Sequence, residues 1–188
     1  MAQAKTLGER ELRIVLRTVA TQRHAHRNRA MFLMSFWAGL RAGEIAALKF
    51  GDVVVNGLVT DRITLGESQT KGTHGRTVMV GEKLRKELTK YAESRARPDR
   101  NAPFFYSQRS RRGMSANTVA QLFGEVYRTA GVDGASSHSG RRTFLTTLAN
   151  KGVSVRILMA LAGHRQMSTT QRYIDLNDRL LSNAVNLL

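Results

Sequence analysis

The sequence predicts a single α+β domain that is mainly α-helical and carries a small antiparallel β-meander near its N-terminal third. Apolar residues recur at helical spacing over most of the chain, and the period changes to that of strands only between residues 53 and 80. No repeat, low-complexity tract or convincing linker divides the 188 residues. A hydrophobic content of 41% with only 2 prolines suits one folded core, so we expect residues 1–188 to form one domain.

Helices are expected where an apolar stripe follows a capping residue or lies between glycines. Thr6 has capping-box spacing to Glu9 and opens the first, Gly39 interrupts the second, and Ser115 or Asn117 caps a later one. The expected helices span about 6–19, 29–38, 42–48, 82–95, 115–129, 140–150, 154–161, 169–174 and 177–187.

Strands are expected in one region, where Asn56-Gly57 is a hairpin turn and a glycine-rich basic tip carries Lys71. The expected strands span 53–55, 58–65 and 76–80.

Basic residues far outnumber acidic ones, with 30 Lys and Arg against 14 Asp and Glu and a formal net charge of +16. Basic side chains set against phosphates release condensed counterions, so this excess predicts a polyanionic partner. The charge is spread from Arg10 to Arg179, which favours a folded basic face over a basic arm. The polar stretch 22–28 reads as a solvated or partner-facing connection. Charge alone leaves DNA, RNA and an anionic membrane surface open.

Other features narrow the class of protein. The most apolar run, 30–40, is too short to span a bilayer, and the N-terminus shows no signal-peptide pattern. The absence of cysteine excludes disulfides, thiolate zinc sites and cysteine nucleophiles, and is compatible with a reducing cytoplasm. We therefore expect a cytoplasmic nucleic-acid-binding domain.

Arg41 and Glu44 stand three residues apart at a predicted helix start, so the carboxylate can hold the guanidinium. Taken alone, an ordinary surface ion pair explains them. Gly39 and Gly43 beside them weaken that explanation, because small residues let a phosphate approach a helix N-terminus.

His138 and Arg141 are one helical turn apart and can face one phosphate, to which the arginine fork gives two parallel hydrogen bonds. Chance or simple capping explains most such pairs. Arg142 points elsewhere on the helix, where we expect it to be structural or to touch another backbone phosphate.

Three further residues have ordinary explanations when they are taken singly. His164 after Gly163 suits a capped helix end, Tyr173 suits a core or surface aromatic, and Lys71 suits a solubilising turn. In combination they indicate more, because a phenol, two histidines and two separated arginines can form a covalent phosphate-handling site without a metal.

Together these segments resemble, in the same order, the catalytic domain of the tyrosine recombinases, the phage integrase family. The resemblance spans roughly residues 6–180 and is carried by four motifs. They are Ala38-Gly39-Leu40-Arg41-Ala42-Gly43-Glu44, Gln69-Thr70-Lys71 followed by 76–80, His138 to Thr143, and Gly163-His164 with Thr169-Thr170 to Tyr173.

The resemblance implies that Arg41 and Arg141 clamp the scissile phosphate of DNA and that Tyr173 is the nucleophile, with Glu44 supporting Arg41. In-line attack by a phenol builds negative charge on the equatorial phosphate oxygens, so fixed cations stabilise the transition state more than the ground state.

The remaining roles implied by the resemblance concern protons. Lys71 would be the general acid for the leaving 5′ oxygen, His138 would assist proton transfer, and His164 would donate a hydrogen bond to a non-bridging oxygen. A 3′-phosphotyrosyl bond retains the energy of the broken phosphodiester, so we expect no metal and no cofactor.

The resemblance further implies double-stranded DNA as partner, a homo-tetramer that exchanges strands through a four-way junction, and an accessory DNA-bending protein as a further partner. Integration, excision, inversion and dimer resolution all stay open. Two alternatives are a type IB topoisomerase that relaxes supercoils, and a non-catalytic accessory protein or basic RNA binder.

The chain departs from the family pattern at Gly140 and Ala162, packing positions where leucine is usual. Too few residues precede the catalytic region for the full N-terminal DNA-clamping domain of many members. The chain is then either a short member, similar to the fimbrial-switch invertases, or a fragment. The tail 176–188 has an apolar stripe that either packs on its own domain or docks on a neighbouring protomer.

Overall fold

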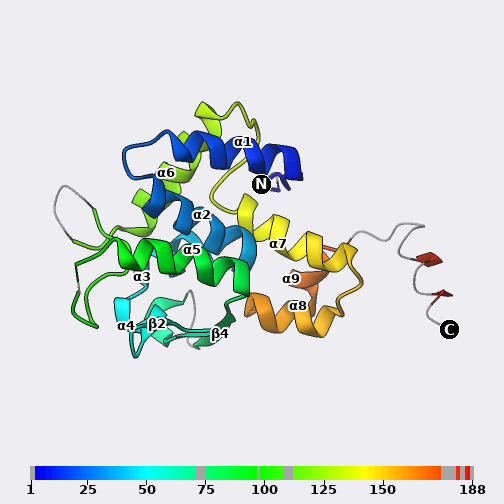
Figure 1. Ribbon diagram of the computed structural model, residues 1–188. Helices are drawn as coiled ribbons and strands as arrows, with labels where there is room; N and C mark the ends of the chain where they lie inside the picture. The colour runs from blue at the N-terminus through cyan, green and yellow to red at the C-terminus, as the bar shows by residue number, and fades with distance from the viewer. Residues whose placement is uncertain are drawn as a thin grey trace.

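In the computed structural model, which describes residues 3–70, 75–96, 98–107, 112–174, 181–182 and 185–186, several helices pack around one central helix (Figure 1). This central helix is α2 (Ala25–Ala38), in which the nearly continuous apolar positions 30–38 are almost all buried. Helices α1 (Glu9–Ala20), α5 (Glu82–Glu93) and α7 (Ser139–Asn150) pack against it. The expectation of a buried helix here is confirmed.

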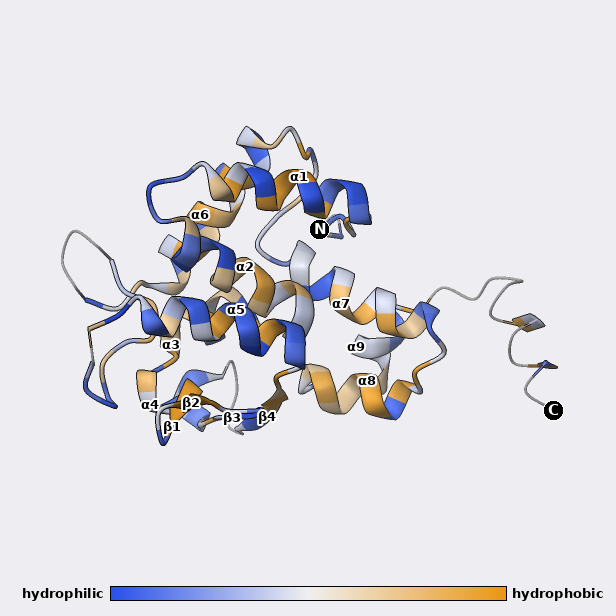
Figure 2. Ribbon diagram, in the orientation of Figure 1, coloured by the Kyte–Doolittle hydropathy of each residue, from blue (hydrophilic) through white to orange (hydrophobic). Residues whose placement is uncertain are grey.

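Of the remaining helices, α8 and α9 lie beside α7 (Figure 1). They are α3 (Ala42–Ala47), α4 (Phe50–Val53), α6 (Ala116–Thr129), α8 (Val155–Ala162) and α9 (Met167–Gln171), with a 3₁₀ turn at Glu67–Gln69. Figure 2 shows hydrophilic residues on the outer turns of α1 and α5 and a mostly hydrophobic α8. Ser115 caps α6 by accepting the Thr118 N–H at 3.1 Å, one of the two expected caps.

The strands form two separate antiparallel pairs. β1 (Val54–Val55) pairs with β2 (Leu58–Val59), and β3 (Arg62–Leu65) pairs with β4 (Arg76–Met79). Antiparallel pairing is confirmed, but the expectation of one strand over 58–65 is wrong. The break falls after Thr60, whose N–H still bonds the Val53 carbonyl beside β1 at 2.9 Å, while its hydroxyl donates to the Arg62 carbonyl at 3.0 Å.

The first helix begins later than expected. The Glu11 carboxylate accepts the Gly8 N–H at 3.1 Å, so α1 begins at Glu9 rather than Thr6. Thr6 makes a tertiary contact instead of capping the helix: its hydroxyl accepts the Nε–H of Arg142 at 3.2 Å.

The central helix begins earlier than expected, at Ala25, so the stretch 22–28 is only partly a connection. Arg27 and Asn28 are buried: Arg27 donates to the Tyr106 carbonyl at 3.1 Å, and Asn28 donates to the Gln22 side chain at 2.6 Å. A basic, polar stretch can thus be interior when its donors find fixed acceptors.

A second, smaller apolar cluster joins α7 to α8. It contains Leu145, Ala149, Leu158 and Ala162, all buried, and Tyr173 packs against it. Through this cluster, α8 and the segment around Tyr173 pack against α7.

Gly140 lies where α7 contacts α2 at Ser35. A Cβ atom there would overlap the Oγ of Ser35, so a leucine has no room. The departure at this position therefore brings the two helices together rather than leaving a void.

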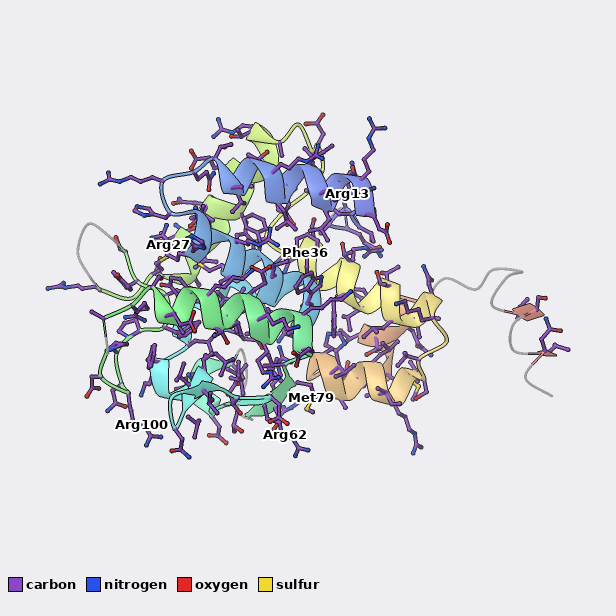
Figure 3. All side chains as sticks on the ribbon, in the orientation of Figure 1. Arg13, Arg27, Phe36, Arg62, Met79 and Arg100 are labelled. Carbon is purple, nitrogen blue, oxygen red and sulfur yellow. The ribbon has the colours of Figure 1, made fainter. Side chains whose placement is uncertain are left out.

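Within the described ranges, no helix is both long and apolar enough to cross a membrane. Exposed arginines lie on several sides of the molecule: Arg13, Arg62 and Arg100 extend outward from α1, β3 and the segment before Phe104 (Figure 3). The helix expected over 177–187 and the tail 176–188 lie largely outside the described residues, of which Leu181 and Val185 are 55% and 69% exposed.

Candidate active site

Arg41 reaches the site through a glycine turn. Helix α2 ends at Gly39, whose φ of +67° is left-handed, and α3 then starts with Arg41 as its N-cap. A Cβ atom on Gly39 would lie 2.7 Å from Cδ1 of Phe144. Both the backbone conformation and the close approach of α7 therefore require glycine here.

Glu44 holds two arginines although only 2% of its side chain is exposed. Its Oε1 accepts from Arg41 Nη1 at 2.8 Å and from Arg76 Nε at 3.0 Å. Its Oε2 accepts from the Arg41 backbone N–H and from Arg76 Nη2, both at 2.8 Å. Burial raises the pKa of Glu44, but hydrogen bonds and charge from Arg76 and then Arg41 outweigh it and lower the pKa below its ordinary value.

Arg141, on the first turn of α7, is buried and joins three segments. Its Nη1 donates to the Gly39 carbonyl at 2.6 Å, and its Nη2 donates to the Ala162 carbonyl at 2.5 Å. The same Nη2 lies 3.0 Å from Nε2 of His164. Arg141 thus fixes the end of α2 and the end of α8 in one place.

This contact determines the tautomer of His164. Since a guanidinium only donates, the Nε2 of His164 must accept, which leaves the proton on Nδ1. Nδ1 lies 2.9 Å from the hydroxyl of Thr170 and can donate to it. Burial first, and then the positive charges of Arg141, Arg41 and Arg76, lower the pKa of His164 to about 4. His164 is therefore neutral at pH 7.

Tyr173 lies against this histidine. The two rings stack with centroids 5.8 Å apart at 19°. The guanidinium of Arg142 lies 5.6 Å from the centroid of the Tyr173 ring. The tyrosine is half-buried, and its backbone N–H donates to the Thr170 carbonyl at 3.0 Å.

The arginines give the site an excess of positive charge. Arg41, Arg76 and Arg141 share a single carboxylate, Glu44. Burial, followed by the charges of Arg41 and Arg76, lowers the pKa of Arg141 to about 9, so Arg141 stays protonated at pH 7. An anion bound between these guanidinium groups would relieve their repulsion.

Of the remaining sequence candidates, the structure describes His138 but not Lys71. His138 is the N-cap of α7, and its exposed side chain has no hydrogen-bond partner among the described residues. Lys71 lies outside the described residues. In the described part of the chain, no three His, Asp or Glu side chains are grouped so that they could hold a metal ion.

Sequence reasoning gave no role in the site to Arg76 or Thr170, although both lie in the matching segments, and it missed the contact of Arg142 with Tyr173. A signal for Arg76 existed: it shares a strand face with Val78 and Val80, which are buried. An arginine on the apolar face of a strand indicates a buried partner. The contact of Arg142 depends on how the chain after α9 folds back, which no spacing in the sequence reveals.

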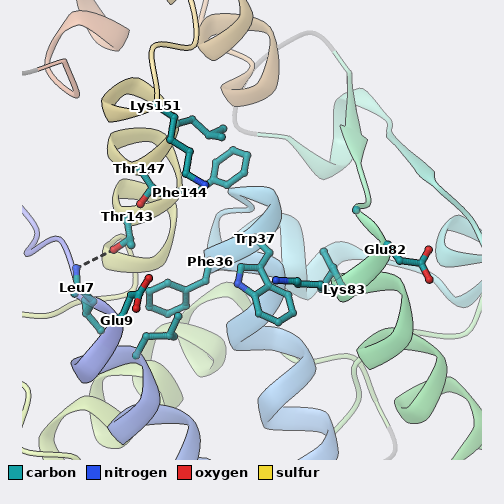
Figure 4. A pocket seen from close by; sticks show the side chains of 15 residues that line it. Leu7, Glu9, Phe36, Trp37, Glu82, Lys83, Thr143, Phe144, Thr147 and Lys151 are labelled. Atoms are coloured by element: carbon teal, nitrogen blue, oxygen red, sulfur yellow. Dashed lines mark hydrogen bonds between the residues drawn. The ribbon is translucent and has the colours of Figure 1, made fainter. Parts of the chain in front are cut away.

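The cluster is separate from an apolar pocket of about 560 Å³ between α1, α2, α5 and α7 (Figure 4). Phe36, Trp37 and Phe144 line that pocket, and the Leu7 N–H donates to Thr143 at its edge at 2.9 Å. None of the described candidate residues lines it. The candidate site is therefore distinct from this pocket.

Fold and site together define a mainly helical α+β domain in which a tyrosine and a histidine lie beside buried arginines. The chain belongs to the phage integrase family, whose family model matches residues 5–179. The fold class and family expected from the sequence are thereby confirmed.

Curated relatives are tyrosine recombinases. The chain is 29% identical over 185 residues to tyrosine recombinase XerA of Pyrococcus furiosus, covering 96% of this chain and 60% of that protein. It is 33% identical over 172 residues to tyrosine recombinase XerA of Thermococcus kodakarensis, covering 90% of this chain and 57% of that protein. The chain thus spans less than two thirds of the length of these relatives.

Solved structures share the fold. The crystal structure of XerA recombinase has a TM-score of 0.77 at 24% identity, covering 100% of this chain and 64% of that one. A post-cleavage complex of XerH site-specific recombinase bound to the palindromic difH substrate has a TM-score of 0.75 at 21% identity, covering 98% of this chain and 53% of that one.

Proposed function

We propose that this chain is the catalytic domain of a site-specific DNA recombinase that cleaves and rejoins DNA through a 3′-phosphotyrosyl intermediate. One observation carries the proposal: Arg41, Arg141, His164 and Tyr173 come from four separate segments and converge on one cluster with excess positive charge. Family membership and the recombinase relatives support the same activity.

In the proposed reaction the phenol oxygen of Tyr173 attacks the scissile phosphorus, and the bond from phosphorus to the 5′ oxygen breaks. The phenol passes its proton to water, a transfer that His138 assists, and the leaving 5′ oxygen gains a proton from Lys71. Arg41 and Arg141 stabilise the charge that builds on the equatorial oxygens. Rejoining is the reverse reaction with a different 5′ hydroxyl, so energy is conserved without a cofactor or metal.

His164 needs a change of hydrogen bonding to take part. Its Nε2 accepts from Arg141 without DNA and must carry a proton to donate to a phosphate oxygen. A bound phosphate would draw Arg141 Nη2 away and offset the positive charges that lower the pKa of His164. The phosphate itself therefore favours the protonated imidazole.

Double-stranded DNA is the proposed partner, supported by the net charge of +16 and by the similarly folded Tn1549 transposon integrase, which was solved in complex with circular intermediate DNA. We further propose that residues 1–188 act as one domain in the cytoplasm, and that four protomers assemble on DNA to pass through a four-way junction. Docking of the tail 176–188 on a neighbouring protomer and an accessory DNA-bending protein belong to the same proposal.

A covalent-trapping experiment tests the chemistry. The protein is incubated with nicked duplexes of randomised sequence, in which the cleaved fragment diffuses away, and strands that become attached to protein are sequenced. Wild-type protein is expected to yield adducts at a defined site, and Tyr173→Phe none. Adducts that persist in Tyr173→Phe would remove Tyr173 as the nucleophile.

The same protein separates the alternative activities. Recombination between two copies of the trapped site, with little relaxation of a single supercoiled plasmid, supports a recombinase. Relaxation alone would favour a topoisomerase. Strong, salt-dependent DNA binding without any adduct would favour a non-catalytic accessory protein.

A further inference from the structure

Arg76 is a charged side chain that is almost wholly buried, yet the proposed chemistry gives it no role. It begins β4, and only 8% of its side chain is exposed. An arginine is buried at this cost only when its donors are matched by fixed acceptors. The groups that accept hydrogen bonds from Arg76 therefore indicate which parts of the molecule it holds in place.

One end of the guanidinium grips Glu44. Nε and Nη2 of Arg76 donate to the two carboxylate oxygens at 3.0 and 2.8 Å, a bidentate arrangement. The same two oxygens accept the Nη1 and the backbone N–H of Arg41. The direction of the Arg41 guanidinium thus depends on a carboxylate that Arg76 orients.

The other end of the guanidinium reaches α8. Nη1 of Arg76 donates at 2.7 Å to the carbonyl of Leu161, in the last turn of that helix. The path is open because Gly163 has no side chain, since a Cβ there would lie 2.5 Å from Cδ of Arg76. His164 follows Gly163 directly in the chain, so this contact of Arg76 also fixes the backbone position of His164.

We infer that Arg76 is a positioning residue that ties α3 to the end of α8 and so fixes Arg41 and His164 relative to each other. The inference rests on the proposed function, in which both residues contact the scissile phosphate. Arg76 acts through Glu44 and Leu161, and its donors are already engaged there.

The test compares Arg76→Lys with a matched control, Arg29→Lys. Arg29 makes the same kind of fork, with Nε and Nη2 each 2.9 Å from an oxygen of Glu87, between α2 and α5. Lysine keeps the charge in both variants but loses the bidentate fork. The substrate is a nicked duplex recovered from the randomised library.

Arg76→Lys is expected to slow adduct formation at saturating DNA on the order of 10²-fold, because small misplacements of catalytic groups have effects of that size. The DNA concentration for half-maximal cleavage should change far less, and Arg29→Lys should cleave like the wild type. Equal slowing in both variants would show that lost stability, not positioning, is the cause and would overturn the inference.

A second measurement needs no DNA. The imidazole NMR signals of His164 should shift in Arg76→Lys and stay in place in Arg29→Lys. Unchanged signals in Arg76→Lys would overturn the inference. If the wild type forms no adduct, the proposed function fails, and the His164 signals alone decide whether Arg76 positions the histidine.

Discussion

The guanidinium of Arg142 lies 5.6 Å from the centroid of the Tyr173 ring, and its Nε donates to the Thr6 hydroxyl at 3.2 Å. The phenol thus contacts an imidazole, His164, and a guanidinium. The N-terminal segment before α1 reaches the proposed nucleophile through one arginine. We expected Arg142 to be structural or to touch another backbone phosphate, and its contacts with Thr6 and Tyr173 agree with the structural role, whereas the phosphate contact stays a prediction.

Replacing Arg142 with Met keeps much of its length and removes its charge. A cation over an aromatic ring contributes roughly 0.5–1 kcal/mol at a partly exposed site, so adduct formation should slow about 2- to 5-fold. Single-turnover cleavage of the nicked duplex measures this. Arg128→Met, on the exposed end of α6, changes the net charge equally and serves as control. Equal slowing in both variants would mean that only net charge matters.

Replacing Arg141 with Lys should nearly abolish cleavage. An ammonium cannot span the Gly39 carbonyl, the Ala162 carbonyl and His164 while also facing a phosphate. The expected loss in adduct formation is on the order of 10²-fold or more. Arg41→Lys should lose a similar factor with less loss of thermal stability, because Arg41 is 28% exposed. Near-normal cleavage by either variant would contradict the proposal that Arg41 and Arg141 clamp the scissile phosphate.

The sequence predicted the elements of this fold well where one local pattern decided them. The apolar run of α2 and the Ser115 cap of α6 need only their own residues. Some expectations that were wrong depend on distant partners, whereas the start of α1 was missed although its cap, Gly8 with Glu11, is local. Thr6 could not be assigned without Arg142, and the burial of Arg27 depends on a carbonyl at Tyr106.

The candidate site shows the same division. Spacing alone placed Arg41 beside Glu44, because three residues at a helix start share a face. Arg76 was missed because its partner lies 32 residues earlier in the chain, and its importance follows from burial rather than spacing. The neutral tautomer of His164 follows only from a contact with Arg141 that the folded chain creates.

Gly163→Ala should destabilise the fold more than its backbone conformation alone explains. Gly163 and Gly152 both have left-handed φ angles, +62° and +81°, but a Cβ on Gly152 would meet nothing within 4 Å. Gly152→Ala should therefore cost about 1 kcal/mol of unfolding free energy. Gly163→Ala should cost a further 1–2 kcal/mol or so, because its methyl group overlaps Arg76. Urea denaturation measures both, and equal losses would show that Arg76 moves aside freely.

His164 should make the stability of the protein depend on pH between about 4 and 6.5. Its pKa falls from an ordinary 6.5 to about 4 on folding, so in this range the unfolded chain binds more protons than the folded one. The unfolding free energy should therefore fall as the pH drops through this window and be fully present above it. Since His164 is half-buried, solvent screening reduces the effect to about 1–2 kcal/mol.

Chemical denaturation of wild type and His164→Gln at pH 7 and pH 5 measures that difference. The variant should lose less stability on acidification, because it has no imidazole to protonate. His24→Gln is the matched control, since burial and then the charges of Arg27 and Arg23 lower the pKa of His24 as well, but at a site away from the candidate active site. A His164→Gln protein as sensitive to acid as the wild type would place the responsible proton elsewhere and remove the argument for a neutral His164.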